Sequence, residues 1–116
     1  PKTIAGAIAD DILFDGHTAL PALRTTHGAA IAVEEEAILA AQLELAAAEG
    51  LLCEPSSAVV IAALRSLPDL SPSTRLCCVI TGSGMKDLGA VRPKLAPIPT
   101  IEPTLEELEK AVERPR

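Results

Sequence analysis

The stretch "VITGSGMKDL", residues 79–88, decides the fold class that the sequence predicts. An apolar, β-branched run ends at the hydroxyl of Thr81, which is typical of a buried strand. Gly82 and Gly84 follow at once and indicate a turn, after which a helix is expected to begin. In an open α/β sheet, ligands bind at the carboxyl ends of the strands. Thr81 is therefore a candidate binding residue, and the two glycines would let a ligand or another backbone segment come close.

The spacing of the glycines excludes three familiar kinds of site. A P-loop needs four residues between its glycines and a following Lys-Ser/Thr. The dinucleotide fingerprint needs a small residue where Asp87 stands. In a serine nucleophile elbow the glycines lie two positions from the serine, whereas Ser83 has them directly beside it. A ligand site at Thr81 and a plain strand–turn–helix connection both remain open.

Hydrophobic spacing predicts an alternation of strands and helices along the chain. Helices are expected at residues 16–27, 34–50, 56–67, after the turn at 82–84, and at 104–114; buried strands are expected at residues 28–33 and 74–81, with a short one before residue 16. This alternation is typical of an α/β fold with parallel strands. Four prolines make residues 92–103 irregular.

Several residues predict where these helices begin and end. Gly50 is a natural C-terminal stop, and Ser56 or Ser57 can cap the helix that follows. Pro55 favours an extended backbone at the residue before it. Thr104 and Glu107 match a capping box for the last helix.

Composition and charge exclude other classes of protein. The 116 residues suit one domain, and a net charge of −6 with a pI near 4.8 argues against binding nucleic acid. We expect no membrane span, because no apolar run is long enough. The cysteine count is three, and Cys77 and Cys78 are adjacent, so a reducing cytoplasm is expected. His17 and His27 have no partner at metal-ligand spacing, so no metal site is expected.

The apolar residues predict a core that is thin for a chain of this length. Phe14 is the single aromatic residue. The helix predicted at residues 56–67 has no polar face before Arg65, which favours burial on all sides. The chain starts at Pro1, not at methionine. We therefore expect a processed chain or a piece of a longer protein.

Glu54 is the second candidate site residue. It lies in "CEPSSA", between an apolar segment and a helix predicted to be buried. A carboxylate in such a place is costly unless it is paired or hydrogen-bonded. Either a structural partner or a ligand could meet that need.

In combination, "TIAGAI", "GAAIAVEEEAILAAQLELAAAEGLLCEPSSA" and "VITGSGMKD" resemble the C-terminal portion of threonine synthases, which are pyridoxal-phosphate (PLP) enzymes of the tryptophan-synthase-β-like fold. The strongest anchors are "EGLLCEPSSA" and "TGSGMKD". The resemblance covers about residues 3–112. It implies a three-layer α/β fragment with parallel strands, the C-terminal part of the large domain of that fold. Residues 1–90 would belong to the PLP-binding domain, and residues 91–116 would form a Pro-rich linker and a C-terminal helix.

The resemblance also implies roles for individual residues. In the family, the residue at the position of Thr81 hydrogen-bonds the pyridine nitrogen of PLP. Gly82 and Gly84 would then give the ring clearance. Glu54 would lie near the ring. A hydroxyl does not keep the pyridine nitrogen protonated, which suits elimination and replacement at the β or γ carbon. The implied enzyme is a cytoplasmic lyase, expected as a homodimer, that converts O-phosphohomoserine and water to threonine and phosphate.

Two parts of the family's site are missing from these residues. The Schiff-base lysine and the glycine-rich phosphate loop lie upstream in the family, and none of the four lysines here has the required context (Lys2, Lys86, Lys94 and Lys110). We therefore expect no catalytic residue in this chain, an N-terminal remainder as its partner, and no activity of the chain alone.

Alternatives within and outside the fold remain. A serine/threonine dehydratase or a tryptophan-synthase-β-like protein is possible, although dehydratases carry a Ser-Gly-Gly-Asn type block at the position of Thr81. A free-standing, non-catalytic α/β module that binds a small ligand is the alternative from another class.

Overall fold

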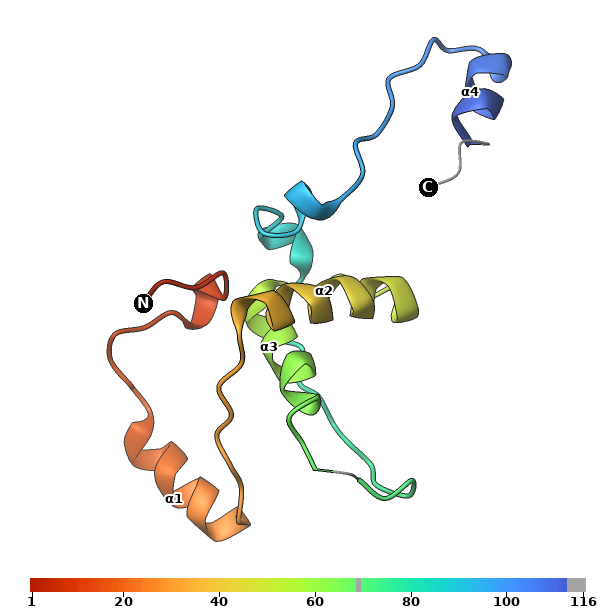
Figure 1. The fold of residues 1–116 in the computed structure, drawn as a ribbon. Helices are drawn as coiled ribbons and strands as arrows, with labels where there is room; N and C mark the ends of the chain where they lie inside the picture. The colour runs from red at the N-terminus through yellow and green to blue at the C-terminus, as the bar shows by residue number, and fades with distance from the viewer. Residues whose placement is uncertain (69, 113–116) are drawn as a thin grey trace.

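The computed structural model describes residues 1–68 and 70–112 (Figure 1). Its elements are the helices α1 (Gly16–Thr26), α2 (Glu35–Glu49), α3 (Pro55–Leu64) and α4 (Leu105–Val112), and the 3-10 turns η1 (Gly6–Ile8), η2 (Gly84–Lys86) and η3 (Arg92–Lys94). Helices predicted at 16–27, 34–50, 56–67 and 104–114 are thus confirmed, with α3 shorter than expected. The last two residues predicted for the C-terminal helix, 113 and 114, lie outside the described residues.

The predicted parallel strands are not found in the described part of the chain. Residues 28–33 and 74–81 are extended without ladder partners and are largely exposed, and the β-type pairing observed is an isolated antiparallel bridge between Cys53 and Ser83. The physical reason is that a strand is stabilised by a neighbouring strand, which an apolar pattern can require but cannot supply. The chain after the glycines also forms only the 3-10 turn η2, not the α-helix that was predicted.

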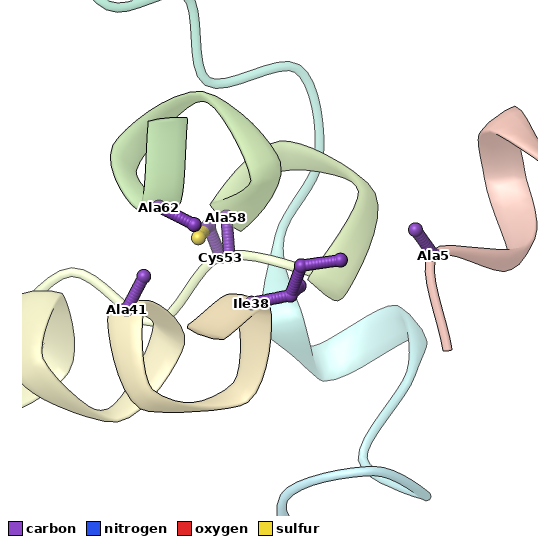
Figure 2. Packing of buried hydrophobic residues seen from close by; sticks show 6 residues of the cluster. All are labelled: Ala5, Ile38, Ala41, Cys53, Ala58 and Ala62. Carbon is purple, nitrogen blue, oxygen red and sulfur yellow. The ribbon is translucent and has the colours of Figure 1, made fainter. Parts of the chain in front are cut away.

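The buried core lies where α2 crosses α3. Figure 2 shows Ile38 and Ala41 of α2 facing Ala58 and Ala62 of α3, with Cys53 between the helices. Most of these side chains are small, so the two helix backbones approach closely and little apolar surface is buried. The prediction of a thin core is confirmed.

Two features predicted for the ends of α2 and α3 are confirmed. Gly50 takes a left-handed backbone (φ 68°) and its N–H donates to Ala46 O at 3.1 Å, which ends α2. Glu54 is extended (φ −70°, ψ 158°) before Pro55, the first residue of α3.

The predicted serine cap of α3 is wrong. Because Pro55 is already the first helical residue, Ser56 and Ser57 lie inside the first turn. Their hydroxyls accept hydrogen bonds from other segments: Ser56 from the N–H of Ala7, and Ser57 from the segment 81–82.

One of the two hydrogen bonds of the capping box predicted for α4 is confirmed. The Thr104 hydroxyl accepts a hydrogen bond from the N–H of Glu107 at 3.3 Å. The Glu107 carboxylate does not reach back to Thr104; it pairs with Lys110, which also contacts Glu106.

The described chain is too extended to be a closed globule. Its radius of gyration is 18.8 Å, whereas about 13–14 Å is usual for a compact domain of this length. Figure 1 shows α1 and α4 projecting from the α2–α3 pair. Pro55, Ala58 and Ala62 of α3 are buried, but its other apolar side chains are half-buried, so the described residues do not bury this helix on all sides. Large apolar side chains are exposed, among them Ile12, Phe14, Val79 and Ile98.

Membrane spanning and domain division are the two remaining predictions. None of the helices in the described residues is both long and apolar enough to cross a membrane. The division into residues 1–90 and 91–116 stays a prediction.

Candidate functional site

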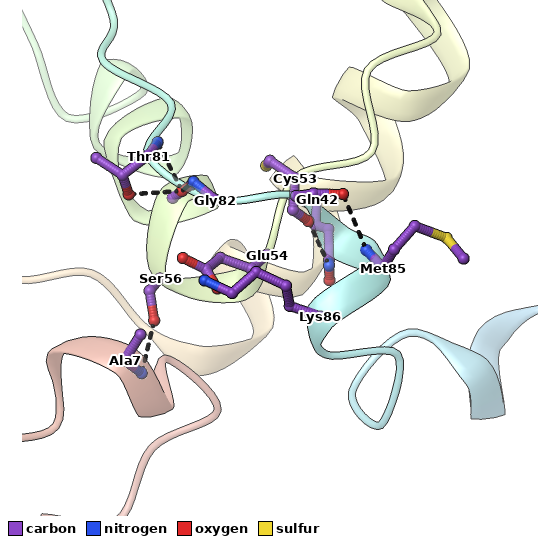
Figure 3. Close-up of polar contacts among 11 residues, drawn as sticks. Ala7, Gln42, Cys53, Glu54, Ser56, Thr81, Gly82, Met85 and Lys86 are labelled. Carbon is purple, nitrogen blue, oxygen red and sulfur yellow. Dashed lines mark hydrogen bonds and ion pairs between the residues drawn. The ribbon is translucent and has the colours of Figure 1, made fainter.

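The two motif blocks singled out in the sequence meet in space. Residues 52–54 and 82–84 run antiparallel: the N–H of Glu54 donates to Gly82 O at 3.0 Å, and the N–H of Gly84 donates to Leu52 O at 2.9 Å. The start of α3 and the glycine turn are thereby joined in one small unit, which Figure 3 shows. We call residues 52–57 and 81–86 the paired turns.

A glutamine of α2 is hydrogen-bonded to the backbone of the paired turns. The Gln42 side chain is fully buried, and its Nε2 donates to Cys53 O at 2.7 Å. Its Oε1 has no hydrogen-bond partner within the described residues. Sequence reasoning missed this residue, although a glutamine one turn after Ile38 in an apolar helix face was a usable signal.

The glycines fit against the chain's own atoms. A Cβ on Gly82 would overlap the Glu54 carboxylate, and a Cβ on Gly84 would lie 2.8 Å from Cys53 O. The sequence left open whether a ligand or another segment of the chain comes close to the two glycines. The structure shows another segment of the chain there, residues 52–54.

Glu54 is buried and paired. Its side chain is 8% exposed, and its Oε2 lies 3.4 Å from Nζ of Lys86, a side chain that is 66% exposed. The need for a partner, predicted from the sequence, is met by a residue of the glycine turn. Lys86 thus serves the paired turns as the ion-pair partner of Glu54.

The most connected polar atom of the paired turns is the Ser57 hydroxyl oxygen. It accepts hydrogen bonds from the N–H groups of Thr81 and Gly82, each at 3.0 Å, and lies 3.0 Å from the Thr81 hydroxyl. Ser57 is 2% exposed, whereas Thr81 is exposed. Sequence reasoning treated Ser57 only as a possible helix cap, because nothing in the sequence tells which segment a buried serine will reach.

Counting donors and acceptors indicates which of the two hydroxyls donates in the bond between them. A serine oxygen has two lone pairs and one proton. Both lone pairs of Ser57 are used by N–H groups, so its proton is directed to the Thr81 oxygen. The proton of Thr81 is then free to be donated to another group.

Other candidate groups lie apart from this unit or carry no site. A hollow of about 660 Å³ is lined by residues of the segment 88–98, with none from the paired turns. Burial raises the pKa of the Cys53 thiol, which favours its neutral form. His17 and His27 are exposed, and within residues 1–68 and 70–112 no cluster of His, Cys, Asp or Glu could hold a metal ion.

Comparison with protein families decides the assignment. Residues 1–82 match the profile of the family described as "Pyridoxal-phosphate dependent enzyme". The chain belongs to this family. Family membership implies PLP as the cofactor and the tryptophan-synthase-β-like fold; the described residues of this chain are mostly helical and form no strands.

The relatives found among curated proteins include several threonine synthases. That of Methanosarcina acetivorans is 41% identical over 90 residues, which is 75% of this chain and 22% of the relative. That of Methanocaldococcus jannaschii is 39% identical over 102 residues, 84% of this chain and 25% of the relative. That of Mycobacterium leprae is 35% identical over 105 residues, which is 85% of this chain and 29% of the relative. The chain therefore spans about a quarter of the length of these relatives.

Proposed function

We propose that this chain forms the pyridine-nitrogen side of the PLP site in a threonine-synthase-like lyase. The observation that carries the proposal is the set of three contacts at Ser57 Oγ, from which we infer that the exposed Thr81 hydroxyl keeps its proton for another acceptor. An unprotonated pyridine nitrogen is an acceptor, so it fits a hydroxyl whose proton has no other use. A protonated nitrogen is favoured by a negatively charged partner, and the Thr81 hydroxyl is neutral.

The direction of this hydrogen bond bears on the reaction class. Bound PLP supplies an electron sink for bonds at the amino-acid carbons. Thr81 holds no negative charge against the ring nitrogen and therefore does not keep it protonated. A neutral ring is a weaker sink, which suits elimination and replacement reactions, as in the conversion of O-phosphohomoserine and water to threonine and phosphate.

Glu54 and Gly82 act in this proposal by shaping the loop that carries Thr81. Gly82 lets the backbone lie against the Glu54 carboxylate, and Lys86 neutralises that charge close to the ring. With PLP bound, Glu54 would lie near the ring with its charge balanced by Lys86, and so would present no net negative charge to the pyridine nitrogen.

The remainder of the site is proposed to lie in a longer polypeptide. The threonine synthases that the chain matches are three to five times as long as the matched segment. We place the lysine that binds PLP covalently, the phosphate loop and the groups that select a small amino-acid substrate in that remainder. Its packing would cover exposed side chains such as Phe14 and Val79 and provide the missing strand partners. A homodimer in the cytoplasm is part of the same proposal.

The test uses the full-length protein expressed from its complete reading frame. We expect stoichiometric PLP and formation of threonine and phosphate from O-phosphohomoserine, with far slower turnover of serine or threonine as dehydratase substrates. Absence of bound PLP would contradict the cofactor role. Bound PLP with preferential deamination of serine or threonine would contradict the threonine-synthase assignment.

A further inference from the structure

We propose that Ser57 is a positioning residue that sets the direction in which the Thr81 hydroxyl donates its proton. The inference rests on the proposed function, because the acceptor of that proton is taken to be the pyridine nitrogen of PLP. It goes beyond the proposed function by assigning a role to a buried residue that does not itself touch the ring.

The first step is the fixed geometry of the Ser57 oxygen. The N–H groups of Thr81 and Gly82 both lie at 3.0 Å from it and occupy its two lone pairs. The third contact, to the Thr81 oxygen, is also 3.0 Å. Only the Ser57 proton remains for that contact, so Ser57 donates and Thr81 accepts.

The second step is that water does not compete for this arrangement. Ser57 is 2% exposed and sits in the first turn of α3, one residue before the fully buried Ala58. A buried hydroxyl cannot exchange its partners for solvent, and losing one of them would leave a polar group unsatisfied. The direction of the bond is therefore set by the fold before any ligand arrives.

The third step is the effect on Thr81. Once its oxygen accepts from Ser57, the proton of Thr81 points away from Ser57. Hydrogen bonds in a chain polarise one another, so donation from two backbone N–H groups through Ser57 strengthens Thr81 as a donor. The result is a chain of hydrogen bonds in which every group donates in the same direction. We call it the relay: the backbone N–H groups donate to Ser57, Ser57 donates to Thr81, and Thr81 donates to an acceptor outside the paired turns.

Ser56 provides a matched control. It is the adjacent serine in the same helical turn, but its hydroxyl accepts from the N–H of Ala7, on the opposite side of α3 from Thr81 (Figure 3). Ser56→Ala removes the same atoms as Ser57→Ala without touching the relay.

The experiment loads the full-length protein with PLP labelled with ¹⁵N in the pyridine ring. The ring-nitrogen resonance and the Kd for PLP are measured for the wild type, Ser56→Ala, Ser57→Ala, Ser57→Cys, Thr81→Val and the double variant Ser57→Ala/Thr81→Val. The cysteine variant leaves no cavity at position 57 but replaces the hydroxyl by a thiol, a weak donor and acceptor, and it serves if the alanine variant does not fold.

We expect Thr81→Val to move the resonance away from its hydrogen-bonded position, and both Ser57 variants to move it in the same direction. The Kd should rise roughly five- to tenfold in the Ser57 variants, the range for one hydrogen bond. Ser56→Ala should match the wild type. In the double variant, Ser57→Ala should shift the ring-nitrogen resonance no further than Thr81→Val alone does. If the role of Ser57 were purely structural, Ser57→Ala would lower stability to the same extent with or without the Thr81 hydroxyl.

Two negative outcomes separate the inference from the function on which it rests. If Thr81→Val moves the resonance but Ser57→Ala and Ser57→Cys leave it at the wild-type position, the positioning role is wrong and the proposed function stands. If the wild-type protein binds no PLP, the proposed function is wrong and the role of Ser57 toward a cofactor is wrong with it.

Discussion

The backbone of Gly82 lies directly against the carboxylate of Glu54, so that a side chain at position 82 would occupy space already taken by that carboxylate. The same two residues are joined through their backbones, since the N–H of Glu54 donates to Gly82 O at 3.0 Å. The glycine turn and the start of α3 are therefore fitted to each other at the site proposed to carry Thr81.

Replacing Gly82 by alanine should separate the paired turns. Because the added methyl group overlaps a buried, ion-paired carboxylate, we expect a loss of about 1–3 kcal/mol in the free energy of unfolding, the usual range for overpacking. PLP affinity should fall as well, since Thr81 moves with the turn. Urea unfolding and PLP titration of the full-length protein measure both effects.

Gly6→Ala is the matched control, because a Cβ at position 6 meets no atom within 4 Å. It should change the free energy of unfolding by a few tenths of a kcal/mol at most. Equal effects of Gly82→Ala and Gly6→Ala would show that Glu54 does not pack on Gly82.

Removing the ammonium group of Lys86 should destabilise the paired turns. Lys86→Gln leaves the Glu54 carboxylate, 8% exposed, without its cation. Since Lys86 itself is 66% exposed, solvent screens the pair and we expect a loss of only about 1 kcal/mol. Lys94→Gln, at the end of η3, is the control because Lys94 makes no ion pair within the described residues.

A double-variant cycle tests this pairing. Glu54→Gln should remove most of the cost of Lys86→Gln, because no buried charge is then left alone. Additive losses from the two substitutions would contradict the ion pair.

Docking of the N-terminal segment onto α2 should depend on pH. The Ile4 N–H donates to Glu35 Oε2 at 2.7 Å, and this bond, together with one from the Thr3 side chain, lowers the pKa of the Glu35 carboxyl. A lowered pKa in the folded state means that the stabilisation is present above the ordinary carboxyl pKa and is lost as pH falls through the lowered value. Protection of the Ile4 amide from hydrogen exchange should therefore decrease as the pH falls below the ordinary carboxyl pKa and through the lowered one.

The variant Glu35→Gln, which carries no charge at position 35, tests whether Glu35 causes this pH dependence. Glu35→Gln should remove the acid-dependent loss of Ile4 protection, and Glu36→Gln, an exposed neighbour in the first turn of α2, should preserve it. A pH profile unchanged by Glu35→Gln would assign the effect to another group.

The 116-residue chain should not retain PLP when expressed alone. None of its lysines has the family's covalent-binding context, and the lysine nearest the proposed ring position, Lys86, is paired with Glu54. We expect PLP to be removed fully by dialysis, with no stoichiometric covalent label after reduction with borohydride. Visible PLP absorbance that survives dialysis at one equivalent would contradict the assignment of the covalent lysine to another part of the protein.

Four of the five predicted helices, and helix ends such as Gly50 and Thr104, could be predicted from the sequence because their causes are local. A 3.6-residue apolar period and caps such as Gly50 and Thr104 act within a few residues of chain. The strands could not be confirmed in the same way. An apolar run such as residues 74–81 shows that burial is needed, but the partner that provides it lies outside the run.

The site was predictable in part for the same reason. Thr81 and Glu54 stand out by residue type and position in their motifs, and the structure brings the two motifs together. The bonds that orient them come from Ser57 and Gln42, whose partners are 24 and 11 residues away in sequence. A single sequence carries no signal for which distant backbone group a buried polar side chain will meet.

The most direct test of the central claim is the crystal structure of the full-length protein with PLP bound. We predict that Thr81 Oγ1 lies within hydrogen-bond distance, about 2.7–3.2 Å, of the pyridine nitrogen, with Ser57 still bonded to Thr81. A pyridine nitrogen that contacts a carboxylate or solvent, with Thr81 Oγ1 beyond about 4 Å, would contradict the account.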